Sequence, residues 1–189
     1  AHSYSLIAFI YEGEGNYKKA YSNIKIATSM LQAVSNRDKD NKEWEKQLKL
    51  YKAFMIPLSF KTGHTVSNDD LLSIEKYDFK ISIDKIISTN HLIDYYQTIG
   101  DWDKSDELIK TNINIISSTE ELDEYNNAIF LSKFHFLYAK QLSNKNLSTE
   151  ANEQCRKSLE LVRPLLEKSN KTSFKKQYSK SSECLVKSV

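Results

Sequence analysis

The stretch YSLIAFIYEGEGNYKKAYSNIKIA, residues 4–27, decides the fold that we predict for the chain. Aromatic, aliphatic and small residues recur at helical spacing from Tyr4 to Tyr11. Gly15 interrupts this run, and a second run beginning at Tyr17 carries one apolar stripe made of Ala20, Ile24 and Ala27. Two apolar stripes of helical period separated by a glycine predict two amphipathic helices joined by a tight turn.

The same residues resemble a tetratricopeptide repeat, whose pattern is W-x2-L-G-x2-Y, then A-x3-F, then P. The residues at the pattern's places are Tyr4, the pair Ile7-Ala8, Tyr11, and Ala20 with Ile24. The closing proline is absent, because the helical pattern continues through Gln32. The resemblance implies a pair of antiparallel helices that stacks on further pairs.

The pattern returns later in the chain at a constant offset. The later residues are Leu92-Ile93, Tyr96, Gly100, Trp102, Ser105 and Ile109. The offset is roughly 85 residues, which is two and a half repeats of about 34 residues. An irregular unit therefore lies between the two matched ones, and residues 41–80 fit that description.

We therefore expect an all-α fold, a right-handed α-solenoid of antiparallel helix pairs with about three to four repeats and a C-terminal capping helix. We expect residues 1–189 to form a single domain. The expected repeats cover residues 1–34, 41–80 (degenerate), 86–119 and 120–166, and the terminal helix covers residues 170–188.

Composition restricts the class of partner. The 189 residues carry a formal net charge of +2, which predicts neither a nucleic-acid partner nor attraction to an anionic membrane. No apolar run approaches the roughly 20 residues of a membrane-spanning helix, so we expect no direct membrane insertion. The chain begins Ala1-His2-Ser3, without Met or a signal-peptide pattern, and we expect it to be a fragment of a larger protein. The Lys-, Asn- and Ile-rich composition favours a bacterial source.

Two cysteines carry information about the compartment. Cys155 and Cys184 each lie about four turns from a predicted turn near Ser169-Asn170, so they reach the same height on adjacent antiparallel helices. They are either two small core residues of a cytoplasmic protein, which we expect, or a disulfide. A disulfide would indicate a periplasmic or other extracytoplasmic sensor domain.

No motif predicts catalysis. The four histidines, His2, His64, His91 and His135, lack metal-ligand spacing. The chain has only four glycines and contains no phosphate-binding loop and no nucleophile elbow. We expect no catalytic residue, no metal and no cofactor.

The resemblance places binding residues on the first helix of each pair. In the tetratricopeptide family these helices line a concave groove that receives a peptide or a partner helix. The corresponding residues are Ser5, Phe9 and Glu12, then Glu45, Lys49 and Lys52, then Asn90, Asp94 and Gln97. Members that clamp a C-terminal carboxylate use Lys and Asn on the first groove helix, where this chain has Ser5 and Phe9. The mixed set favours a partner with apolar and charged groups, and a merely solvated inner face stays open as the alternative.

Three function classes stay open. The first, which we favour, is a non-enzymatic scaffold or sensor module that binds a protein or peptide within a larger signalling or regulatory protein. The second is a small-ligand or signal-peptide sensing domain that controls an attached output domain. The third is a repeat-bearing enzyme with its catalytic part elsewhere. A homo-oligomer is compatible with each class.

Overall fold

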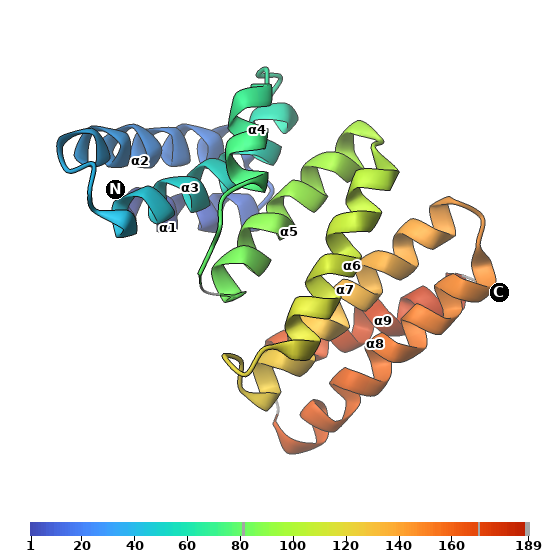
Figure 1. Cartoon of the computed structure of the whole chain (residues 1–189). Helices are drawn as coiled ribbons and strands as arrows, with labels where there is room; N and C mark the ends of the chain where they lie inside the picture. Colours follow the sequence, from blue (N-terminus) through green and yellow to red (C-terminus); the bar gives the residue numbers. More distant parts are fainter. Residues whose placement is uncertain (81, 170, 188–189) are drawn as a thin grey trace. The chain divides into compact units, whose positions relative to one another are not determined.

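Figure 1 shows the computed structural model, which describes residues 1–80, 82–169 and 171–187. These residues form α-helices and no strand, so the predicted all-α class is confirmed for the part described. The helices divide between two compact units, Ala1–Asp101 and Trp102–Val189. We call them unit 1 and unit 2 and describe each by itself.

Unit 1 contains the helices α1 His2–Gly13, α2 Tyr17–Arg37, α3 Lys42–Lys61, α4 Asn68–Glu75 and α5 Ser82–Ile99. Side chains cap several of them: the Asn41 amide oxygen accepts from backbone N–H groups at the start of α3, and Ser67 does the same for α4. The expected repeat over residues 1–34 corresponds to α1 and α2. The degenerate repeat over residues 41–80 corresponds to the long α3 and the short α4.

The turns that follow α1, α3 and α5 share one geometry. Each contains a glycine with positive φ, +75° at Gly15, +79° at Gly63 and +81° at Gly100. In each, a backbone N–H donates to the carbonyl five residues earlier: Asn16 to Tyr11 at 2.8 Å, His64 to Ser59 at 2.8 Å, and Asp101 to Tyr96 at 2.9 Å. This is the Schellman closure, which requires a left-handed residue. The similarity predicted between the Gly15 and Gly100 turns extends to their hydrogen bonds.

Small residues allow α1, α2 and α3 to pack closely. The core of this part of unit 1 is formed by Ala8, Ala20, Ile24, Ala27, Phe54 and Leu58. Three of these residues are alanines with no exposed surface, which lets neighbouring backbones approach. The stripe that identified the first helix pair is therefore a buried interface between helices.

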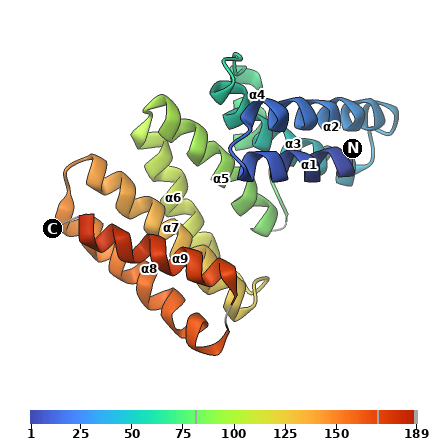
Figure 2. The ribbon, with the colours of Figure 1, turned by 180° about the vertical axis from the view of Figure 1, so that it is seen from behind.

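Unit 2 contains the helices α6 Trp102–Ser118, α7 Glu124–Asn144, α8 Ser148–Lys168 and α9 Thr172–Lys187. Figure 2, the view from behind, shows α7, α8 and α9 as neighbours in one bundle. The expected repeat over residues 120–166 corresponds to α7 and α8. The expected repeat over residues 86–119 is divided, because its first helix is α5 of unit 1 and its second is α6 of unit 2. The expected terminal helix corresponds to α9, and its outermost predicted residues, Asn170 and Ser188, lie outside the described residues.

Serine hydroxyls and a disulfide connect the last three helices. Ser132 of α7 and Ser158 of α8 each reach the other's carbonyl oxygen, at 2.9 and 2.7 Å, and Ser181 of α9 lies 2.6 Å from the Ser158 hydroxyl. All three are fully buried. Cys155 and Cys184 form a disulfide between α8 and α9, with their Cα atoms 5.9 Å apart. The equal height predicted for the two cysteines is confirmed, and the disulfide alternative is the one found.

Candidate functional site

The predicted binding residues on α1 are not all at the surface. Ser5 is 2% exposed, and its hydroxyl lies 2.7 Å from the His2 carbonyl oxygen and 3.1 Å from the Tyr51 hydroxyl of α3. The expectation that Ser5 points outward is wrong, because Ser5 lies in the contact between α1 and α3. Phe9 is 44% exposed and Glu12 is half-buried, so both reach the surface of α1 as expected.

The predicted residues on α3 gather on one side of that helix, next to α4 and the segment that follows it. The ammonium group of Lys52 lies 2.9 Å from an Asp70 carboxylate oxygen of α4, and that of Lys49 lies 5.9 Å from the Tyr77 ring centroid. Burial, with neighbouring Lys52 adding to it, holds the pKa of Lys49 below its usual value. Glu45 forms an ion pair with Lys42 within α3, at 3.1 Å.

The opposite side of α3 faces Phe9. Phe54 lies about two and a half helical turns beyond Glu45, which places the two side chains on opposite faces of the helix. The rings of Phe9 and Phe54 stack, with centroids 4.1 Å apart and planes inclined by 15°. The structure therefore does not bring Glu45, Lys49 and Lys52 together with Phe9.

The predicted residues on α5 share one face of their helix. Asn90 is exposed, and Asp94 and Gln97 are half-buried, at the spacings of four and three that align side chains along a helix. A carboxylate oxygen of Asp94 lies 2.6 Å from the Lys61 ammonium group at the end of α3. That ammonium group also lies 5.1 Å from the centroid of the Tyr17 ring of α2. The Asp94 side chain is therefore held in place by its partner.

The structure thus assembles a surface from three helices, which we call the Phe9 face: Phe9, Phe54, Lys61, His91 and Asp94. His91 completes the aromatic part, with its ring centroid 5.0 Å from Phe54 and 6.5 Å from Phe9. Phe54 is 3% exposed and forms the floor, whereas Phe9 presents its outer ring surface. Phe9 and Asp94 are the two members of this face that the sequence reasoning selected.

Burial controls the charge of His91. It lowers the pKa of the imidazole from 6.5 to about 4, while the Asp94 carboxylate opposes this shift and the Lys61 ammonium group adds to it. His91 is therefore neutral at pH 7, and a neutral ring packs against two phenylalanines at low cost. The Phe9 face combines an uncharged aromatic patch with one ion pair at its edge.

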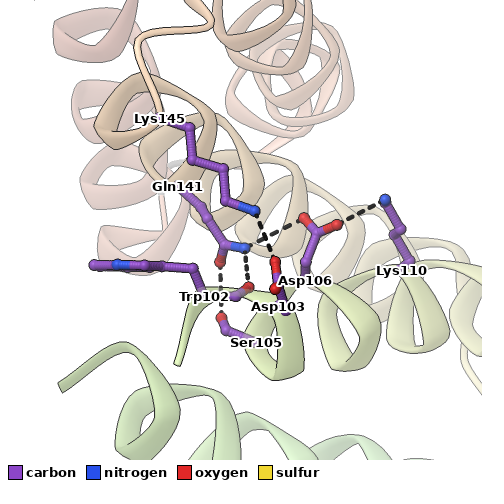
Figure 3. A network of polar contacts seen from close by, with 7 residues as sticks. All are labelled: Trp102, Asp103, Ser105, Asp106, Lys110, Gln141 and Lys145. Carbon is purple, nitrogen blue, oxygen red and sulfur yellow. Dashed lines mark hydrogen bonds and ion pairs between the residues drawn. The ribbon is translucent and has the colours of Figure 1, made fainter. Parts of the chain in front are cut away.

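Unit 2 contains a polar network that the sequence reasoning missed (Figure 3). Gln141 of α7 has no exposed surface, and its side chain reaches three groups on α6. Its amide oxygen accepts from the Ser105 hydroxyl at 2.7 Å, and its amide nitrogen donates to the Trp102 carbonyl at 2.8 Å and to an Asp106 carboxylate oxygen at 3.2 Å. Asp106 also pairs with Lys110 at 2.7 Å. The network uses the hydrogen-bonding capacity of the amide to hold α6 against α7, so we assign it to the structure of unit 2.

In the described part of the chain, no group of three or more His, Cys, Asp and Glu side chains is placed to hold a metal ion. None of its helices combines the length and the apolar composition that crossing a membrane requires. Comparisons with protein-family models, with curated proteins and with solved structures gave no match.

Proposed function

We propose that this chain is a non-enzymatic helical-repeat module that binds a peptide or protein segment on the Phe9 face of unit 1. The observation that carries the proposal is Phe9 itself, an aromatic ring that is 44% exposed and yet held in a stack on Phe54. Aromatic side chains, Phe included, are enriched at the core of protein interfaces, and a side chain whose orientation is already fixed loses less entropy on binding.

The geometry favours binding without large rearrangement. Phe9 rests on Phe54, and the Lys61–Asp94 pair orders the edge of the face, so little side-chain entropy remains to be lost on binding. An apolar or aromatic side chain of a partner would cover Phe9, and a polar group of the partner would meet the ion pair. Asp94 is engaged by Lys61 and His91 is covered by two rings, which supports a binding role over acid–base chemistry.

The wider role that we propose rests on the repeat pattern. The common closure of the turns at Gly15, Gly63 and Gly100 supports a series of related helix pairs, similar to tetratricopeptide repeats stacked in a right-handed solenoid. Modules of this kind serve as interaction parts of larger proteins, and we propose a signalling or regulatory protein of a bacterium.

The disulfide bears on the compartment. A bond between Cys155 and Cys184 supports a location in an oxidising compartment, the extracytoplasmic alternative, because cytosolic thiols are kept reduced. A thiol count on the denatured protein, purified without reductant, tests this: we expect none, whereas two free thiols would favour the cytoplasm.

The binding proposal is tested by selecting peptides from a display library on the immobilised chain. A selected peptide should raise the unfolding temperature of unit 1, because a ligand that binds the folded state stabilises it. Phe9→Ala should weaken its affinity at least tenfold, as expected for an aromatic anchor.

Ile7→Ala is the matched control. Ile7 is 39% exposed on the same helix, but it lies two residues from Phe9 and so points to nearly the opposite side. Its substitution should leave the affinity within about twofold. Equal effects of the two substitutions would refute binding at the Phe9 face, as would a selection that yields no peptide.

A further inference from the structure

Helix α2 carries charge of one sign. Its sequence, YKKAYSNIKIATSMLQAVSNR, contains four basic residues and no acidic residue. The whole chain has a formal net charge of only +2, so this helix departs strongly from the balance elsewhere. A one-sided charge on a single helix attracts partners of the opposite sign.

The surface of α2 is hollowed where α3 adjoins it. One cleft of about 710 Å³ is lined by Lys18, Tyr21, Ser22, Lys25, Ile26, Ser29, Met30, Thr62 and His64. A second of about 460 Å³ shares Tyr21, Lys25 and Ser29 with the first, and extends to Asn36 and to Met55 of α3. The two clefts therefore form one groove along α2, which we call the α2 groove. From Lys18 to Asn36 it is about 27 Å long at the helical rise per residue.

The chemistry of the groove changes along its length. Lys18 lines the first cleft together with His64, and Lys25 lies where the two clefts meet; neither lysine forms an ion pair within the described part of the chain. Tyr21 lies between His64 and Lys25, with its ring centroid 4.3 Å from that of His64 and 5.8 Å from the Lys25 ammonium group.

The remainder of the lining is apolar or neutral. Ile26 and Met30 are 43% and 45% exposed, and they are joined along the second cleft by Ala33 and Met55. No acidic side chain lines either cleft. A ligand in this groove would meet positive charge at one end and apolar side chains beyond it.

We propose that the α2 groove binds an acidic peptide segment, separately from the Phe9 face. Two carboxylates about 10 Å apart would match Lys18 and Lys25, which are separated by about two helical turns. Apolar side chains of the same segment would then contact Ile26 and Met30. An extended segment of about eight residues covers the length of the groove.

Two features favour a peptide over an anionic membrane surface, the other partner that a basic helix can attract. Ile26 and Met30 line a cleft together with Thr62 and His64, which follow α3, whereas membrane association requires an apolar face that projects into the lipid. The hydroxyls of Ser22, Ser29 and Thr62 lie in the same lining and offer hydrogen bonds to a peptide backbone.

The test is fluorescence anisotropy with a labelled ten-residue peptide that has Glu residues in its first half and Leu and Phe in its second. The full chain should bind it, with an affinity that falls as salt is added. Lys18→Ala with Lys25→Ala should weaken binding at least tenfold. The matched control is Lys19→Ala with Arg37→Ala, which removes the same charge from α2 outside both clefts and should change the affinity less than threefold.

The outcomes separate the alternatives. No binding at millimolar peptide, or equal weakening by both pairs of substitutions, would overturn the proposal. Stronger binding to vesicles containing phosphatidylserine than to the peptide would assign the helix to a membrane instead. Phe9→Ala should leave the affinity for this peptide unchanged, so failure here is distinguishable from failure of binding at the Phe9 face.

Discussion

Acidification from pH 7.5 to pH 5 should destabilise unit 1 through His91. Because burial lowers the pKa of the imidazole from 6.5 to about 4, the unfolded chain binds a proton between these pH values and the folded unit does not. The free energy of unfolding is therefore highest above pH 6.5 and falls as the pH falls toward 4. The full shift corresponds to at most about 3 kcal/mol, and the part lost by pH 5 to about 2 kcal/mol.

Urea denaturation followed by the fluorescence of Trp44 measures this effect. Trp44 lies in unit 1, so a Trp102→Phe background keeps the signal from unit 2 out of the measurement. This matters because burial also lowers the pKa of His135 in unit 2. His91→Gln should remove most of the loss, whereas His64→Gln, an exposed position in the same unit, should retain it. If the His91→Gln variant loses as much stability as the parent chain, the burial of a neutral imidazole against Phe9 and Phe54 is not the cause.

Three further predictions concern stability. Reducing the Cys155–Cys184 disulfide should lower the free energy of unfolding by roughly 3.5 kcal/mol in urea denaturation, because the bond closes a loop of 29 residues. An unchanged midpoint would show that the bond is absent or without effect. Gln141→Leu should lower the free energy of unfolding by about 2–3 kcal/mol, because the fully buried Ser105 hydroxyl loses its acceptor and the bonds to the Trp102 carbonyl and to Asp106 are lost. A loss below about 0.5 kcal/mol would contradict the network. Gly100→Ala should destabilise unit 1 by about 1 kcal/mol, because Gly100 has a positive φ, whereas Gly13→Ala within α1 should not destabilise it. Urea denaturation of each variant measures both effects, and equal effects would contradict the turn geometry.

The helices and their turns could be predicted because their signals are local. The stripe of Ala20, Ile24 and Ala27 repeats at the helical period, and each of these residues is fully buried in the structure. Gly15 and Gly100 mark turns because a left-handed residue is needed there, and this need acts within about five residues of chain. The cysteine pair could be placed by the same helical geometry, although the choice between thiols and a disulfide could not.

The binding surface was harder to predict because it depends on the register of α3. The resemblance to a tetratricopeptide repeat placed Glu45, Lys49 and Lys52 on the groove side. In the structure that side of α3 adjoins Asp70 and Tyr77, whereas Phe54, which is 3% exposed, lies on the opposite side against Phe9.

Contacts between helices distant in sequence gave no local signal at all. The Lys61–Asp94 pair and the contact of His91 with Phe9 join different helices, so the periodicity of residues within one helix does not predict them. Gln141 was missed for a related reason, because a polar residue within a helical pattern is ordinarily assigned to the surface. In this chain its partners are supplied by another helix.

Binding at the Phe9 face is the central claim. The most direct measurement is an NMR titration of the isotope-labelled chain with a peptide selected on the Lys18→Ala, Lys25→Ala variant, in which the α2 groove has lost its positive charge. We predict chemical-shift changes concentrated at Phe9, His91 and Asp94, with small changes at Lys18 and throughout unit 2. Changes confined to α2 or to unit 2, with the resonances of Phe9 and His91 unmoved at saturation, would contradict the claim.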